Sequence, residues 1–161
     1  MLKYFIAAVF FVLCIFLGTT FTSIIFKWRE EHFVCDTNLV VEKEDKSLSV
    51  AISYFINGSS GIAVLKGNLK VNDKGYSISR RSYFTLEKEQ GLIHVKSTLA
   101  AATPADNAPL SELDKVLPQF YLKKDKKMDF SIYYQGWGGY IFSTGYVPSF
   151  YCKRVSKVSS V

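Results

Sequence analysis

The sequence predicts a mainly β protein with one apolar helix at its N-terminus and one short helix within the β portion. From about residue 33 onward, hydrophobic residues fall at every second position, which is the period of half-buried strands. Turn sequences rich in Asn, Asp and Gly separate these runs. Consecutive short strands joined by tight turns are typical of an antiparallel meander, so we expect a strongly curved sheet or a barrel.

The N-terminal segment is long enough to cross a membrane. Residues 4–26 contain no charge, and a helix of that length spans about 34 Å, against about 30 Å for a hydrocarbon core. A cleaved signal peptide is the alternative, but its apolar region is usually shorter, about 7–15 residues. We therefore expect a retained signal anchor over residues 1–28, an exported β domain over residues 29–153 and a flexible tail over residues 154–161.

Small residues recur every four positions on one face of this predicted helix, at Cys14, Gly18 and Thr22. Rows of small residues let two membrane helices approach closely. This face is therefore a candidate contact with a membrane partner, although apolar segments also contain such spacings by chance.

The positions of the three cysteines indicate the cellular compartment in which the predicted β domain lies. Cys14 lies within the apolar segment, whereas Cys35 and Cys152 lie near the two ends of the predicted β domain. In an oxidising compartment a disulfide between them would close a long loop and stabilise the domain by about 4–5 kcal/mol. Two buried free thiols in a cytosolic domain are the alternative. We expect the disulfide, and with it a cytoplasmic N-terminus and a domain outside the cytoplasm.

The strands are expected at residues 33–44, 47–57, 61–72, 75–88, 91–100, 127–135 and 139–153. Between the fifth and the sixth, Asp106 or Asn107 is a candidate N-cap for a short amphipathic helix with Pro109 in its first turn. Pro148 places the end of the last strand at an edge or a bulge. Because an odd number of strands closes poorly as an up-and-down barrel, we expect an unpaired edge that a partner strand completes.

Arg80 is the candidate ligand-binding residue. It shares the inward phase of Ile78 and Phe84, and a buried guanidinium needs an anionic partner. One interpretation is an anchor for an anionic ligand at the rim of an apolar cavity. The alternative is a bulge at Arg80 and Arg81, or a strand end, that turns the charge towards solvent.

The sequence offers little for catalysis, metal binding or nucleic-acid binding. His32 and His94 lie in no nucleophile motif, and two distant Cys with two His do not supply a zinc site. The net charge of +6 includes three basic residues that flank the apolar segment, and phosphate binding would need a basic stripe that is not present. We expect no cofactor. Paired carboxylates from distant positions leave a small envelope hydrolase as an alternative.

Four motifs resemble those of the FidL-like membrane proteins of enterobacteria. They are Phe33-Val34-Cys35, Phe120-Tyr121-Leu122, Tyr140-Ile141-Phe142-Ser143-Thr144-Gly145 and Pro148-Ser149-Phe150-Tyr151-Cys152. The resemblance implies a single-pass bacterial inner-membrane protein with a periplasmic domain, found beside a ToxR-like, membrane-anchored transcription regulator. By analogy of layout with the companions of such regulators, ToxS and VtrC, it implies a lipocalin-like barrel that can bind a bile salt.

The predicted function is therefore that of an accessory protein rather than an enzyme. Its expected partners are the periplasmic domain and transmembrane helix of the regulator, membrane lipid around the anchor, and an amphipathic small molecule such as a bile salt. A stand-alone periplasmic lipid- or ligand-binding protein is the alternative in the same class.

Overall fold

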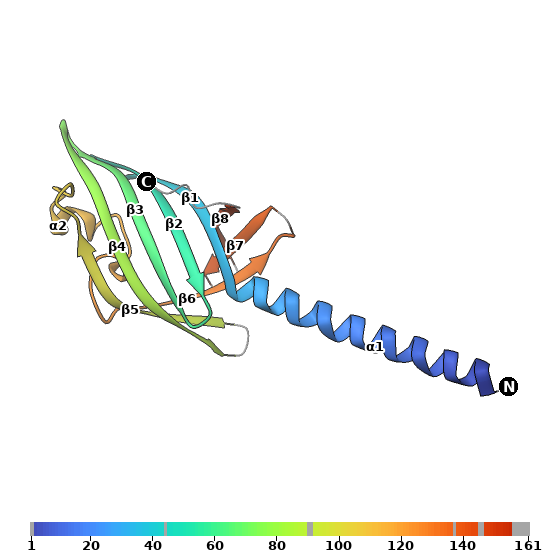
Figure 1. The fold of residues 1–161 in the computed structure, drawn as a ribbon. Helices are drawn as coiled ribbons and strands as arrows, with labels where there is room; N and C mark the ends of the chain where they lie inside the picture. The colour runs from blue at the N-terminus through green and yellow to red at the C-terminus, as the bar shows by residue number, and fades with distance from the viewer. Residues whose placement is uncertain (1, 44, 90–91, 137, 145–146, 156–161) are drawn as a thin grey trace. The chain divides into compact units, whose positions relative to one another are not determined.

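The computed structural model describes residues 2–43, 45–89, 92–136, 138–144 and 147–155. The chain divides into two compact units, residues 1–32 and residues 33–161. The first unit consists of one helix, α1 (Leu2–Glu31). The second is an antiparallel barrel of eight strands in sequence order (Figure 1). These strands are β1 (His32–Lys43), β2 (Lys46–Asn57), β3 (Ser60–Val71), β4 (Lys74–Glu89), β5 (Leu92–Ala102), β6 (Lys127–Tyr134), β7 (Gly139–Thr144) and β8 (Val147–Arg154).

Helix α1 is long and apolar enough over Val9–Glu31 to cross a membrane. A signal sequence near an N-terminus can meet the same criteria of length and hydropathy. The hydroxyl groups within it are satisfied by the helix itself, since Thr22 Oγ1 donates to the carbonyl of Gly18 at 3.1 Å. Such internal bonds let Thr and Ser lie in an apolar environment without an unpaired donor.

The central strands β2, β3 and β4 form long ladders because their alternating sequences match over their full length. β2 pairs with β3 from Lys46–Val71 to Asn57–Ser60. Inward side chains such as Leu48, Leu65 and Leu69 are fully buried, as alternation requires. The barrel interior is therefore a packed hydrophobic core.

Gly67 permits the close approach of β2 and β3. A Cβ atom at this position would lie 2.1 Å from the carbonyl oxygen of Ser49 and 2.7 Å from Cα of Val50. Both neighbours are backbone atoms, which cannot rotate away as a side chain can. Only glycine fits this point of the ladder.

The count of seven predicted strands was wrong, because the predicted strand 139–153 is two strands. Thr144 of β7 pairs with Val147 of β8, so the chain reverses within that segment. Eight strands form the closed barrel, and the argument from an odd strand number does not hold. Pro148 pairs with Ser143 next to a register shift between Phe142 and Ser143, which confirms the predicted irregularity at this proline.

The predicted helix between the fifth and sixth strands is much shorter than expected. It comprises α2 (Leu110–Leu113) and a separate 3₁₀ turn, η1 (Gln119–Tyr121). The N-cap is Pro109, with no side-chain capping bond. The predicted cap residues instead form hydrogen bonds with main-chain amides of β4. Asn107 Oδ1 accepts a hydrogen bond from the amide of Ser77 at 2.7 Å, and Asp106 Oδ2 accepts one from the amide of Ser79 at 3.0 Å.

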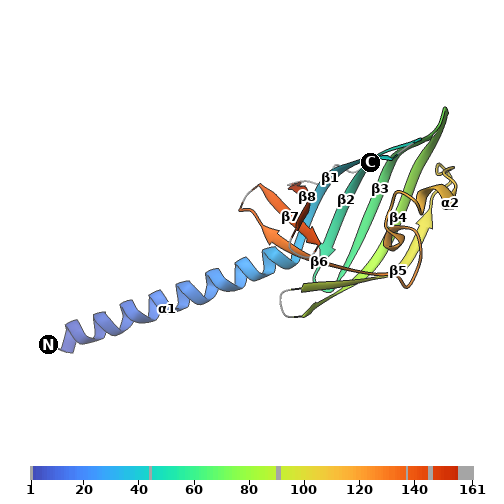
Figure 2. The ribbon, with the colours of Figure 1, turned by 180° about the vertical axis from the view of Figure 1, so that it is seen from behind.

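The connection between β5 and β6 lies against β4 and β5, as the view from behind shows (Figure 2). Phe120 of η1 is buried, with its ring centroid 5.3 Å from that of Phe84 on β4. Its carbonyl accepts a hydrogen bond from the buried hydroxyl of Ser82 at 3.0 Å. Contacts of this kind make η1 part of the barrel core.

Cys35 and Cys152 form the predicted disulfide, with their Cα atoms 5.4 Å apart. Both cysteines are completely buried. The bond joins β1 to β8 and spans 117 residues of sequence, so it ties the first strand of the barrel to the last. The prediction from cysteine positions is confirmed.

Candidate functional site

The barrel has a seam between β1 and β8. These strands pair only at Cys35–Arg154 and Asp36–Lys153 within their described residues. The strand pairs from β2–β3 to β7–β8 have longer ladders; β7 and β8, for example, pair from Gly139–Lys153 to Thr144–Val147. Beyond Asp36, therefore, one edge of β1 and one edge of β8 separate from each other.

An apolar pocket of about 290 Å³ lies behind this opening, and we call it the seam pocket. Side chains from both separated strands and from β7 form its walls. They are Thr37, Leu39 and Val41 of β1, Thr144 of β7, and Ser149 and Phe150 of β8. The remaining lining comes from the core strands and from the connection between β5 and β6. These residues are Ile52, Val116, Pro118, Tyr121, Met128, Phe130 and Phe142.

The lining combines aromatic rings with a few hydroxyl groups. Phe142 and Phe150 stack at 4.8 Å between centroids, and Tyr54 stacks on Phe142 at 5.1 Å. At the wall, the hydroxyls of Thr144 and Ser149 lie 2.8 Å apart. All of the described residues that line the pocket are uncharged. An apolar cavity with a few placed polar groups is the usual form of a small-molecule site.

One residue of the pocket lining, Tyr121, belongs to a pair of buried hydroxyl groups. Tyr121 lines the pocket, and its hydroxyl oxygen is 2.5 Å from that of Tyr54. Burial raises the pKa of Tyr121 to about 12. Burial, together with the neighbouring Tyr121, raises the pKa of Tyr54 well above its ordinary value. Both groups are therefore neutral hydrogen-bond donors at physiological pH.

Arg80 points inward as predicted, but it does not line the seam pocket. Its Nε and Nη2 donate to Oδ2 and Oδ1 of Asp106 at 2.8 and 3.0 Å, and Nη2 also donates to the carbonyl of Ala108 at 3.3 Å. The required anion is thus a carboxylate of the same chain. The prediction that Arg80 anchors an external anion is wrong, because Asp106 already occupies the guanidinium.

The alternative bulge at Arg80 and Arg81 is also absent from the ladder. Arg80 pairs with Ala102 and Arg81 with Ala101 in regular register, and the register shift between β4 and β5 occurs at Tyr83 and Phe84. Arg80 therefore keeps the inward phase that the sequence predicted.

The other candidate residues lie on α1 or on the barrel surface. On α1, the position of Cβ at Gly18 has no atom within 4 Å and Cys14 is an exposed free thiol, so the small-residue face with Thr22 remains a prediction. On the barrel, His94 Nδ1 lies 2.7 Å from Asp129 Oδ1. Within the described ranges, no group of three or more His, Cys, Asp or Glu side chains is placed to hold a metal ion.

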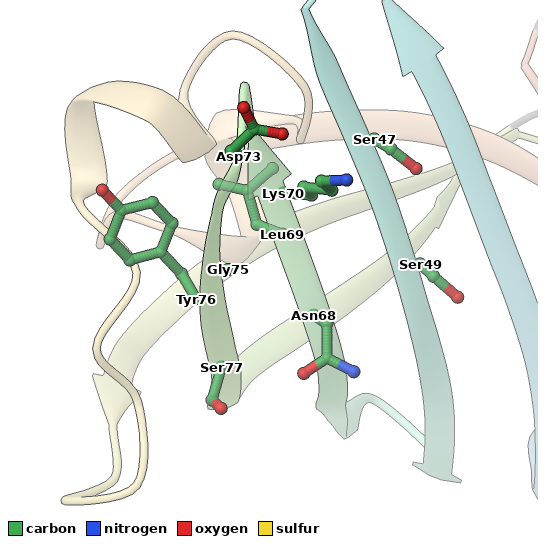
Figure 3. Close-up of a pocket in the computed structure, with 9 residues that line it drawn as sticks. All are labelled: Ser47, Ser49, Asn68, Leu69, Lys70, Asp73, Gly75, Tyr76 and Ser77. Carbon is green, nitrogen blue, oxygen red and sulfur yellow. The ribbon is translucent and has the colours of Figure 1, made fainter.

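A second hollow, of about 390 Å³, lies at the end of β2, β3 and β4 near the turn at residues 72–73 (Figure 3). Ser49 and Asn68 are paired neighbours there, as are Ser47 and Lys70. These polar groups occupy the outward positions of regular strands, as expected for the solvent face of a sheet. We therefore take the seam pocket as the candidate site.

Residues 32–152 match the family model of the YqeJ C-terminal domain. The chain belongs to this family. The matched residues of this chain include the disulfide, the residues that line the seam pocket and both tyrosines of the hydroxyl pair. No curated protein and no solved structure matches the chain. The resemblance to the FidL-like proteins, and the regulator that it implies, stay predictions.

Sequence reasoning missed the central polar feature of this YqeJ C-terminal domain. Tyr54 and Tyr121 are separated by 67 residues, and no local pattern joins them. Tyr54 was visible as an inward strand residue, and Tyr121 as part of the Phe120-Tyr121-Leu122 motif. A buried tyrosine usually finds a hydrogen-bond partner, but the sequence does not say which.

Proposed function

We propose that this YqeJ C-terminal domain is the periplasmic, partner-binding part of a single-pass inner-membrane protein with a cytoplasmic N-terminus. Its partner is a ToxR-like, membrane-anchored transcription regulator, whose periplasmic domain it binds and stabilises. The observation that carries the proposal is the seam, where unpaired edges of β1 and β8 lie beside an apolar pocket. A strand from the regulator pairs with β1 and places alternate side chains over the seam pocket.

The hydrogen-bonding direction of β1 supports this mode of binding. The amide of Val155 donates to the carbonyl of Val34 at 3.0 Å, so the main-chain groups of Val34 face β8. Because these groups alternate along a strand, those of Asn38 and Val40 face the same side. They lie beyond the last register pair at Asp36, and no described residue of β8 pairs with them, so an added strand can bind there.

Exposed apolar side chains flank the opening on both strands. Val40 of β1 is 62% exposed and Tyr151 of β8 is 48% exposed. Exposed apolar residues beside an unpaired edge are a liability unless a partner covers them. The α1 face of Cys14, Gly18 and Thr22 supplies the contact with the regulator's transmembrane helix, and lipid surrounds the rest of α1.

An amphipathic ligand such as a bile salt occupies the seam pocket in this proposal. Its apolar rings lie against the lining residues Phe142 and Phe150, and the partner strand closes over it. The pocket is formed within a single chain, which also favours the alternative of a stand-alone periplasmic ligand-binding protein. The two candidates differ in whether a stoichiometric partner is needed.

The test is co-purification of the tagged full-length protein with the candidate regulator from detergent-solubilised membranes. Val40→Pro removes the outward amide donor while leaving the ladder to β2 intact, since proline is tolerated where the amide faces away from the neighbouring strand. Val40→Thr is the matched control, because it keeps the amide and a β-branched side chain. We expect stoichiometric capture by the wild type and by Val40→Thr, and loss of capture by Val40→Pro at unchanged melting temperature.

Equal capture by all three proteins would contradict strand addition at β1. No capture by the wild type, together with retained ligand binding, would favour the stand-alone protein instead.

A further inference from the structure

We propose that the seam pocket binds the uncharged, flat end of its ligand, and that the Tyr54–Tyr121 hydroxyl pair donates a hydrogen bond to a carbonyl or hydroxyl oxygen of that end. The inference rests on the proposed function only in using the same pocket. It replaces Arg80 as the polar contact of the ligand and specifies an uncharged group where the sequence predicted an anion.

The first argument is charge. The described residues that line the pocket are uncharged, and Arg80 is held by Asp106. A carboxylate placed deep in the pocket would lose its hydration without gaining a cationic partner, which is strongly unfavourable. The buried end of the ligand is therefore neutral. A charged end, if there is one, lies outside the opening.

The second argument is hydrogen-bond accounting. Two hydroxyl groups carry two hydrogens, and only one of them can lie between the oxygens of Tyr54 and Tyr121. Among the described residues, these two hydroxyls bond to each other and to no further acceptor. One donor therefore remains for an oxygen of a ligand bound in the seam pocket, which Tyr121 lines.

The hydroxyls of Thr144 and Ser149 do not provide an equivalent buried donor, because both side chains are exposed and water can accept the hydrogen that their mutual bond leaves unused. Thr144 and Ser149 are bonded to each other, and Ser149 Oγ also accepts the amide of Thr144 at 3.2 Å. Thr144 and Ser149 are both exposed, so they mark the polar rim. Tyr54 and Tyr121 are nearly completely buried, where a hydrogen bond is electrostatically stronger than in water.

The third argument is shape. Tyr54, Phe142 and Phe150 are stacked at small interplanar angles, 25° or less for each pair. A parallel set of rings favours a flat partner. The volume of about 290 Å³ corresponds to the lower limit of small-molecule sites, about 300 Å³. The ligand class is thus a compact, planar, neutral ring system with a carbonyl or hydroxyl oxygen, such as an aryl ketone or a quinone.

The experiment compares three related naphthalene probes on the full-length protein held in amphipol. Prodan is a neutral aryl ketone, 2-(dimethylamino)naphthalene lacks the carbonyl, and 6-(dimethylamino)-2-naphthoate carries a negative charge. Specific binding is the fluorescence signal above that of Leu39→Trp, in which a larger side chain fills the pocket. The protein variants are Tyr54→Phe/Tyr121→Phe, which removes both hydroxyls, and Tyr133→Phe, which removes an exposed one.

We expect prodan to bind the wild type and the double variant to bind it about three- to tenfold more weakly, the usual range for one hydrogen bond. The affinity for the probe without a carbonyl should stay the same in the double variant, and Tyr133→Phe should match the wild type with every probe. The naphthoate should bind at least tenfold more weakly than prodan.

Two results would overturn the inference: an equal loss of affinity for prodan and for its carbonyl-free analogue, or naphthoate binding as tight as that of prodan. Absence of any signal above Leu39→Trp would also overturn it. The proposed function is judged separately, because capture of the regulator by the wild type and by Val40→Pro is measured without a probe.

Discussion

Arg80 on β4 holds Asp106, 26 residues later, through a two-pronged ion pair with nitrogen–oxygen distances of 2.8 and 3.0 Å. The Arg80 and Asp106 side chains are 10% and 2% exposed. Asp106 also accepts from the amide of Ser79. The pair therefore fastens the connection after β5 to β4, and its role is to position the segment that carries Tyr121.

Removing one member of this pair should be much worse than removing both. Asp106→Ala leaves a buried guanidinium without its counter-charge, and we expect it to lower the free energy of unfolding by about 3–5 kcal/mol. Arg80→Met combined with Asp106→Leu should cost clearly less, because no buried charge remains. Urea unfolding of the two proteins measures the difference. Equal losses would show that the pair contributes only through its packing.

Substitution of Gly67 tests the close approach of β2 and β3. Gly67→Ala places a methyl group against the backbone of Ser49 and Val50, and we expect a loss of about 2–3 kcal/mol, typical of overpacking. Gly75→Ala is the matched control, because nothing lies within 4 Å of its Cβ position. Thermal unfolding of both variants gives the comparison. A similar small effect at both positions would mean that the two strands separate easily.

The strands were predictable because half-buried strands impose a local period of two. That period correctly located the strands through β6, and it gave Arg80 its inward phase. The period could not predict that Asp106 pairs with Arg80, because such a contact depends on the path of the connection after β5 rather than on a repeating pattern. Asp106 and Asn107 look like helix caps locally, but their carboxylate and amide groups bind β4 amides instead.

The candidate site was less predictable than the fold for a similar reason. The barrel is closed, so the odd strand count from which an unpaired edge was expected was wrong, although β1 and β8 pair at only two register positions among their described residues. The seam pocket depends on where β1 and β8 separate, and its lining comes from β1, β2, β6, β7, β8 and the connection that carries α2 and η1. The disulfide was predictable because Cys35 and Cys152 had no competing partner in the β domain.

The role of α1 as a retained membrane anchor is testable by fusion. Alkaline phosphatase placed after Val161 should be active, because it folds only outside the cytoplasm under oxidising conditions. A reporter that is active only in the cytoplasm should stay inactive at the same site. Sequencing the N-terminus of the membrane-bound protein checks retention directly. A mature N-terminus beyond Thr20 would show that the segment is cleaved as a signal peptide.

The tyrosine pair predicts a loss of stability in alkali. Burial raises the pKa of Tyr121 to about 12 in the folded protein, whereas an unfolded tyrosine titrates near 10. The unfolded chain therefore releases this proton first as the pH rises. The contribution of neutral Tyr121 to folding stability is therefore complete below pH 10. It is lost between about pH 10 and 12, where the free energy of unfolding should fall by about 2–3 kcal/mol.

Substitution assigns that alkaline loss to the pair. Tyr121→Phe should reduce the fall in stability between pH 10 and 12, and it should lower stability at neutral pH by about 1–3 kcal/mol because the hydroxyl of Tyr54 loses its partner. The double variant Tyr54→Phe/Tyr121→Phe should lose less unfolding free energy at neutral pH than the sum of the losses in the two single variants. The reason is that no buried hydroxyl is left unpaired in the double variant. Tyr133→Phe, at an exposed position, should keep the wild-type pH profile. Urea unfolding of the wild type, these three variants and the single variant Tyr54→Phe at pH 7, 10 and 11.5 measures these differences. An unchanged alkaline profile in Tyr121→Phe would show that other groups cause the loss.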